Sequence, residues 1–150
     1  MKLEFKPDIC TTTNYSFVQK RVDIGNNEEL ILYLWDSIGQ EKYRTLSHIY
    51  LRNSDCIVLG YDITRRETFI ELDYWYKTIK EYSSCNLIYL IGNKVDLYDG
   101  RQVNKDEAIQ YAELYNLRFF EVSCKTDEGL NIFYNDLVNN ILELYIAKNQ

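Results

Sequence analysis

The chain has 150 residues, of which 46% are hydrophobic and 15% aromatic, and its formal net charge is −6 at pH 7. This length and this apolar content are sufficient for one compact domain and exclude an intrinsically disordered chain. The acidic balance, without any cluster of lysine and arginine, argues against a nucleic-acid surface and against a polybasic membrane patch. We therefore expect a single domain over residues 1–150 that does not bind nucleic acid.

The cysteines and the apolar runs indicate the compartment. Cys10, Cys56, Cys85 and Cys124 have no C-x-x-C spacing, and three of them lie in or beside apolar runs. This pattern favours buried free thiols in a reducing compartment over disulfides or a zinc site. No apolar run approaches the roughly 18 residues of a membrane span, and the first eight residues lack the apolar core of a signal peptide. The expected location is the cytoplasm.

The first part of the chain predicts an exposed loop and a β-hairpin. Met1–Asn14 has little periodicity and contains three consecutive threonines, which is typical of a loop. Tyr15–Ile24 alternates apolar and polar residues, and a short polar segment with Gly25 separates it from the apolar run Leu30–Asp36. We predict two antiparallel strands.

Strands and helices then alternate to the end of the chain. Lys42–Arg52 has near-helical spacing of apolar residues, and Asp55–Asp62 is a short apolar strand. Thr64–Tyr82 begins with Thr64-x-x-Glu67, a capping-box pattern, and carries an apolar helical face. The later predicted elements are a strand at Leu87–Ile91, a helix near Lys105–Leu117, a strand at Arg118–Val122 and a helix near Gly129–Ala147.

This order predicts the fold class. Alternating strands and helices imply parallel pairing with right-handed crossovers and with helices on both faces of the sheet. We expect an α/β, doubly wound, mostly parallel sheet with one antiparallel edge hairpin.

The stretch Leu30–Glu41 predicts a site at the end of a strand. Its apolar run suggests a buried strand that ends in Asp36, followed by a small polar loop. Ligands bind at the carboxyl ends of strands in α/β sheets. Asp36 would hold a divalent cation there, directly or through water, and Gly39 would let a backbone N–H approach a phosphate. Taken alone, this short pattern favours an ordinary strand followed by a polar turn, so the functional interpretation depends on the motifs downstream.

A second loop, Gly92-Asn93-Lys94-Val95-Asp96, follows the strand NLIYLI. The carboxylate of Asp96 can accept two parallel hydrogen bonds from a guanine ring N–H and its exocyclic amine, which adenine cannot offer. The aliphatic stem of Lys94 can lie against a purine face, while Asn93 would fix the loop by bonding to neighbouring backbone. A polar turn is the alternative interpretation of this motif.

A third loop, Ser123-Cys124-Lys125, follows the strand FFEV, and its backbone N–H groups are candidates to meet the guanine carbonyl. None of the three loops is specific by itself. Their order, D-x-x-G-Q, then N-K-x-D, then S-x-K, each directly after a predicted strand, predicts that they converge on one guanine nucleotide.

With these motifs the chain resembles a small GTPase of the Ras superfamily, and more closely a Rab, from about Pro7 to about Leu144. Trp35–Glu41 resembles W-D-T-A-G-Q-E, and Tyr61-Asp62-Ile63-Thr64 resembles a strand end that Rabs share. The resemblance implies a P-loop GTPase-like fold and a role in vesicle transport. Its expected ligands are GTP or GDP and Mg²⁺, and its expected partners are effector and regulator proteins that bind through residues 12–50.

The resemblance also assigns two residues in the first part of the chain. Gln40 matches the glutamine that orients the attacking water in GTP hydrolysis. Thr12, five residues before Phe17, matches the threonine that meets Mg²⁺ and the γ-phosphate. Thr11 and Thr13 adjoin Thr12, and Asn14 replaces the family's glycine, so an ordinary threonine-rich loop remains an alternative.

Two departures from the family affect these expectations. The sequence contains no G-x-x-x-x-G-K-[ST] motif, and the family's first strand, which lies in the middle of the sheet, is also missing. We expect two unpaired strand edges there, and a nucleotide affinity lower by roughly a thousandfold or more. The chain also ends without the cysteines that are prenylated in Rabs. We expect no direct membrane anchor in this chain; a lipidated full-length form would act at endomembranes.

These departures leave two further interpretations open. The chain is either a nucleotide-poor pseudo-GTPase that presents Phe17, Trp35 and Tyr43 to protein partners, or an incomplete gene product that lacks its N-terminal part. A dinucleotide-binding domain is disfavoured, because no G-x-G-x-x-G follows any predicted strand.

Overall fold

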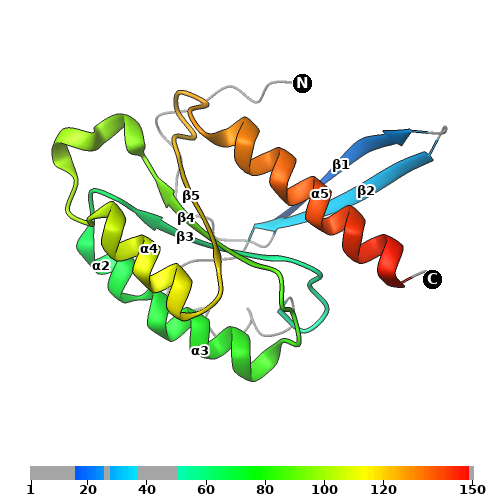
Figure 1. The fold of residues 1–150 in the computed structure, drawn as a ribbon, viewed down its shortest axis with the longest axis horizontal. Coiled ribbons are helices and arrows are strands. Elements are labelled where there is room, and N and C mark those ends of the chain that lie inside the picture. Colours follow the sequence, from blue (N-terminus) through cyan, green and yellow to red (C-terminus); the bar gives the residue numbers. More distant parts are fainter. Residues whose placement is uncertain (1–15, 26–27, 37–50, 149–150) are drawn as a thin grey trace.

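The computed structural model describes residues 16–25, 28–36 and 51–148. Figure 1 shows a central three-stranded sheet between helices, with a two-stranded hairpin beside it. The elements, in chain order, are β1 (Ser16–Gly25), β2 (Glu28–Asp36), β3 (Ile57–Asp62), α2 (Arg66–Ile70), α3 (Leu72–Tyr82), β4 (Ile88–Asn93), the 3-10 segment η2 (Val95–Gly100), α4 (Lys105–Leu114), β5 (Arg118–Val122) and α5 (Leu130–Lys148).

The three-stranded sheet has the order β3-β4-β5, and both pairs are parallel. Helices α2, α3 and α4 cover one face of this sheet, and α5 covers the other (Figure 1). The doubly wound α/β class predicted from the sequence is therefore confirmed. The predicted strand Arg118–Val122 is matched residue for residue by β5.

Each face of the sheet has its own apolar core. On the face of α2, α3 and α4, Leu90 of β4 is fully buried among residues that include Phe69 and Leu72. On the opposite face, Tyr89 of β4 is also fully buried, and it packs with Leu137 of α5. Consecutive residues of β4 thus face opposite cores, as the alternation of side chains along a strand requires. This burial on both faces explains why β4 is an almost continuous apolar run.

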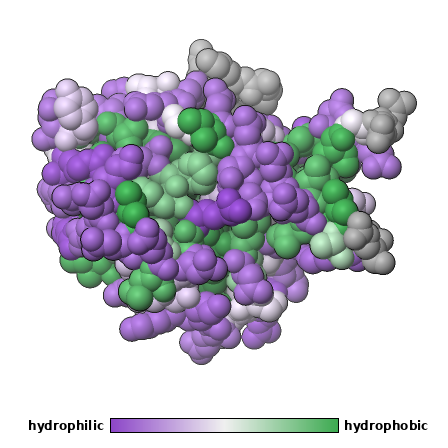
Figure 2. Space-filling view, in the orientation of Figure 1, coloured by the Kyte–Doolittle hydropathy of each residue, from purple (hydrophilic) through white to green (hydrophobic). Residues whose placement is uncertain are grey.

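The hairpin pairs β1 with β2 in antiparallel register, with Phe17 opposite Trp35 and Val22 opposite Leu30. It forms a separate sheet, and it carries apolar side chains that are visible in green at the right of Figure 2. The prediction that the Leu30 run forms a buried strand is wrong, because within β2 only Leu32 is buried. The described residues cover the hairpin only in part: Lys20 lies 3.9 Å from the ring centroid of Tyr134 in α5, whereas Tyr33, Leu34 and Trp35 are exposed.

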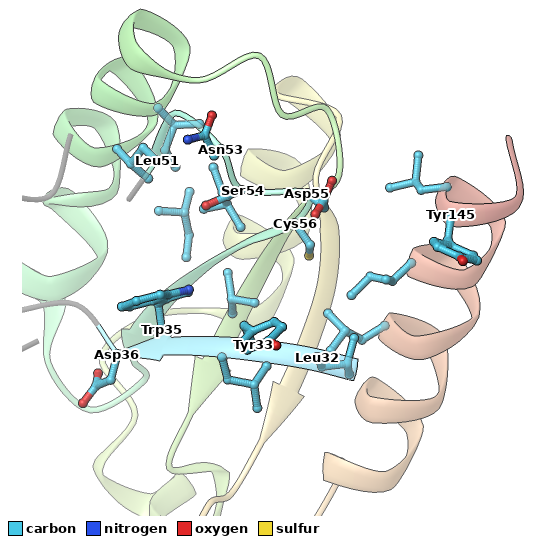
Figure 3. Close-up of a pocket in the computed structure, with 18 of the residues that line it drawn as sticks. Leu32, Tyr33, Trp35, Asp36, Leu51, Asn53, Ser54, Asp55, Cys56 and Tyr145 are labelled. Atoms are coloured by element: carbon cyan, nitrogen blue, oxygen red, sulfur yellow. The ribbon is translucent and has the colours of Figure 1, made fainter. Parts of the chain in front are cut away.

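A groove of about 1260 Å³ lies between β2 and β3 (Figure 3). Its walls include apolar residues of the two strands, of α3 and of α5, such as Leu32, Leu59, Trp75 and Ile141. The two strands do not hydrogen-bond to each other, so among the described residues the sheet is interrupted at this place, as expected from the missing strand.

The segment Thr64–Tyr82 differs from its prediction. It forms two helices, α2 and α3, that are separated at Glu71. The predicted capping box is also wrong: Arg65 is the N-cap residue and its side chain makes no cap hydrogen bond, while the N–H of Arg66 donates to Gln102 Oε1 at 3.1 Å. The hydroxyl of Thr64 instead donates to Asp62 Oδ1 at 2.7 Å. Because Arg65 is the N-cap residue, the helix begins one residue later than the capping-box pattern requires.

None of the helices in the described part of the chain combines the length and the apolar character that a membrane span requires.

Candidate functional site

The carboxyl ends of β3, β4 and β5 lie at the same edge of the sheet. The strand register places Asp62 beside Asn93, and Asn93 beside Val122. The loops that follow β4 and β5 therefore start next to each other, which brings the motif around Asn93 and the motif that starts at Ser123 together as the sequence predicts.

Asn93 joins these two loops through its side chain. Its Oδ1 accepts a hydrogen bond from the N–H of Lys94 at 2.7 Å and another from the N–H of Cys124 at 3.2 Å. The expected bonding of Asn93 to neighbouring backbone is thus present. Lys94 has a φ of 72°, which is unusual for a residue with a side chain, and the hydrogen bond that its N–H donates to Asn93 helps to hold this conformation.

Asp96 is held by the loop that follows β5. Its Oδ1 accepts a hydrogen bond from the hydroxyl of Ser123 at 2.6 Å, and its Oδ2 lies 3.9 Å from the ammonium of Lys125. Ser123 is fully buried, so its hydroxyl holds the carboxylate of Asp96 from the interior of the protein. Because a carboxylate offers about four acceptor positions, Asp96 keeps capacity for further donors.

The backbone N–H groups of the third loop already have acceptors within the protein. The N–H of Ser123 donates to Glu128 O at 2.9 Å, that of Cys124 to Asn93, and that of Lys125 to the Ser123 hydroxyl at 3.2 Å. A guanine carbonyl at this place would share the long bonds of Cys124 and Lys125 rather than meet free donors.

The burial of the described cysteine thiols agrees only in part with the prediction. Cys85 is buried and Cys56 is half-buried, but Cys124 is exposed. The prediction of a buried thiol is therefore wrong for Cys124, because this residue lies in the loop beyond the apolar strand. Cys10 lies outside the described residues.

Asp62 is a site residue to which the sequence assigned no role. Its Oδ2 lies 2.6 Å from Lys94 Nζ, and its Oδ1 accepts from both the N–H and the hydroxyl of Thr64. Burial opposes the charge of Asp62, but the hydrogen bonds from Lys94 and Thr64 outweigh it and lower the pKa of this carboxyl group below its ordinary value. The available signal was the recurrence of an acidic residue at the end of an apolar strand.

Of the residues predicted to hold the metal and the phosphate or to act in catalysis, the structure describes only Asp36. Asp36 stands at the carboxyl end of β2, as predicted, and its side chain is exposed. Thr12, Gly39 and Gln40 lie outside the described residues. Within the described ranges, no group of three or more histidine, cysteine, aspartate or glutamate side chains is arranged to hold a metal ion.

The comparisons with known proteins agree with this geometry. Residues 1–143 match the model of the family described as "Ras family". The chain is 35% identical over 141 residues to Ras-related protein Rab-18-B of Danio rerio, which covers 93% of this chain and 68% of the relative. It is 37% identical over 140 residues to Ras-related protein Rab-2B of Dictyostelium discoideum, with 93% and 69% covered. It is 39% identical over 140 residues to Ras-related protein RABC2b of Arabidopsis thaliana, with 91% and 68% covered.

Proposed function

This chain belongs to the Ras family and is Rab-like, and on that premise we propose that it binds GTP and GDP as a switch protein in vesicle-mediated transport. The observation that carries the proposal is the carboxylate of Asp96, which Ser123 holds at 2.6 Å beside the loop of Asn93 and Lys94. All of these residues lie at the carboxyl edge of the parallel sheet.

The base is recognised by Asp96. Its carboxylate, 13% exposed, has free acceptor positions for the ring N–H and the exocyclic amine of guanine. Adenine presents no such pair of donors, so the contact selects guanine. The half-exposed stem of Lys94 covers the face of the purine.

The phosphates and Mg²⁺ belong to the other half of the proposed site. Asp36 and Thr12 would hold Mg²⁺, Gly39 would let its backbone approach the γ-phosphate, and Gln40 would orient the attacking water. When bound, Mg²⁺ neutralises charge on the phosphate oxygens. The 150 residues contain no G-x-x-x-x-G-K-[ST] motif, so we expect these residues alone to bind nucleotide weakly and through the base in large part.

The hairpin carries exposed aromatic residues that could bind protein partners. Phe17, Tyr33 and Trp35 are each more than half exposed, and the Phe17 ring centroid lies 5.0 Å from that of Trp35 and 6.2 Å from that of Tyr33. An exposed aromatic cluster is typical of a protein-binding surface. We propose that effectors and regulators bind here, within residues 12–50. The same surface favours the second candidate function, a binding module that does not cycle nucleotide.

Calorimetric titration of the 150-residue chain with GDP and Mg²⁺ distinguishes these candidates, with ADP as the control. Binding of GDP at micromolar or tighter affinity, with no binding of ADP, supports the switch protein and rules out the nucleotide-poor module. The absence of GDP binding at millimolar concentration would refute the switch function for these residues.

A further inference from the structure

The carboxylate of Asp62 points into the same edge of the sheet as the guanine loop, yet it contacts Lys94 rather than Asp96. We propose that Asp62 is a positioning residue, which holds the ammonium of Lys94 so that the stem of Lys94 forms a fixed platform for the base. This inference rests on the proposed guanine-nucleotide site and adds to it a residue at the end of a different strand.

Asp62 is itself held firmly. Its N–H donates to the hydroxyl of Thr68 at 3.0 Å, and the following N–H, that of Ile63, donates to Asn93 O at 3.1 Å. Thr64 donates twice to Oδ1, at 2.9 Å from its N–H and at 2.7 Å from its hydroxyl. Only Oδ2 is left for Lys94, at 2.6 Å. The carboxylate is 11% exposed, so solvent competes weakly for this pair.

Lys94 needs such support because of its backbone. Its φ of 72° is unfavourable for a residue with a Cβ. This backbone conformation persists only when other contacts stabilise it. The backbone N–H of Lys94 donates to Asn93 and its ammonium pairs with Asp62, so both the backbone and the end of the side chain are anchored. The stem between them is half exposed and is therefore available to a flat ligand.

Asp62 and Asp96 thus have different tasks. The partner of Asp96 at hydrogen-bond distance is the neutral hydroxyl of Ser123, and its carboxylate keeps acceptor capacity for the base. The carboxylate of Asp62 already accepts two hydrogen bonds from Thr64 and one contact from Lys94, so it keeps less capacity for further donors than Asp96. We therefore expect its effect on the nucleotide to pass through Lys94.

A double-mutant cycle tests this dependence. Asp62→Asn and Lys94→Met each remove the ion pair, and methionine keeps the apolar stem. We expect each variant to bind GDP about tenfold more weakly, and the double variant to lose little beyond either single one. Losses that multiply to about a hundredfold in the double variant would show that Asp62 acts independently of Lys94, and would overturn the proposal.

Amide hydrogen exchange on the nucleotide-free chain provides a second measurement. The N–H of Leu97 donates to Lys94 O at 2.9 Å, so it reports the order of this loop. We expect faster exchange of Leu97 in both single variants, with exchange of Leu90 in β4 unchanged. Glu107→Gln, which breaks an ion pair with Arg66 elsewhere, is the control and should leave Leu97 unchanged. Unchanged exchange in Asp62→Asn and Lys94→Met would also overturn the proposal.

The two proposals fail differently. If the unmodified chain does not bind GDP, the proposed function is refuted, and the exchange experiment alone decides whether Asp62 orders the loop. If the chain binds GDP but the cycle is additive, the function stands and the role of Asp62 is refuted. Lys94→Met removes the ion pair with Asp62 by changing the more exposed partner, a substitution that we expect to disturb folding less. This variant therefore tests the proposal even if Asp62→Asn fails to fold.

Discussion

Gly129, between the third loop and α5, should not tolerate a side chain. Its φ is +71°, and a Cβ added there would lie 2.4 Å from the carbonyl oxygen of Glu121 and 3.4 Å from Val122 Cγ1. The nearest atom belongs to the backbone of β5, so it cannot rotate away as the end of a side chain would. The substitution Gly129→Ala therefore combines an unfavourable left-handed conformation with a steric overlap.

The magnitude follows from these two costs. A residue with a Cβ in the left-handed region costs about 1–2 kcal/mol. Relief of the overlap requires a shift of more than half an ångström between β5 and the start of α5, comparable to overpacking a core, which costs about 1–3 kcal/mol. We expect Gly129→Ala to lower the free energy of unfolding by about 2–5 kcal/mol, a large part of the stability of a domain of this size.

Urea unfolding followed by tryptophan fluorescence measures this loss. Gly60→Ala in β3 is the matched control, because nothing lies within 4 Å of an added Cβ and its φ is not in the left-handed region. The control should stay within about 1 kcal/mol of the unmodified chain. A loss below about 1 kcal/mol for Gly129→Ala, or equal losses in the two variants, would refute the reasoning.

Three further predictions concern the site and the second core. Asp96→Asn should shift binding from GDP toward xanthosine diphosphate in competition titrations, because the amide donates where the carboxylate accepted; an unchanged preference contradicts base recognition by Asp96. Tyr89→Phe removes the hydrogen bond from the buried Tyr89 hydroxyl to Asp136 Oδ2 at 2.8 Å, and should cost about 1–3 kcal/mol in urea unfolding; a cost near zero contradicts this. The lowered pKa of Asp62 contributes stability above its unfolded value near pH 4, and this contribution is lost as pH falls through the folded pKa. Unfolding midpoints between about pH 5 and 2 should therefore fall less for Asp62→Asn than for the unmodified chain, whereas equal slopes would contradict the assignment.

Local patterns predicted the central strands and helices but not the environment of the hairpin. Leu90 and Tyr89 lie in an apolar run bounded by polar loops, and such a run marks a strand whatever it contacts. The apolar residues of β2 gave the same signal, yet Tyr33 and Trp35 are exposed. A run of apolar residues reports what a segment can bury, whereas its actual burial depends on which layer of the fold lies over it.

Two contacts were beyond local patterns for a related reason. The pair of Asp62 with Lys94 joins the ends of two strands that are 32 positions apart in the chain, and it exists because β3 and β4 pair in parallel with Asp62 beside Asn93. Thr64 and Glu67 have the spacing of a capping box, but the helix begins at Arg66, and the N–H of Arg66 donates to Gln102 from a distant part of the chain. Spacing alone does not show which side chain from a distant segment reaches the first N–H group of a helix.

The arrangement of the loops proposed to bind the base was predictable because their residues follow their strands directly. Parallel pairing carries Asn93 and Ser123 to one edge, and the hydrogen bonds that order Asn93, Asp96 and Ser123 come from residues 93–128. Base specificity should therefore be determined within this segment. The residues assigned to the phosphates and Mg²⁺ lie before it, at Thr12 and from Asp36 to Gln40. Changes in those residues should alter the affinity for guanine nucleotides as a class and leave the preference for guanine over adenine unchanged.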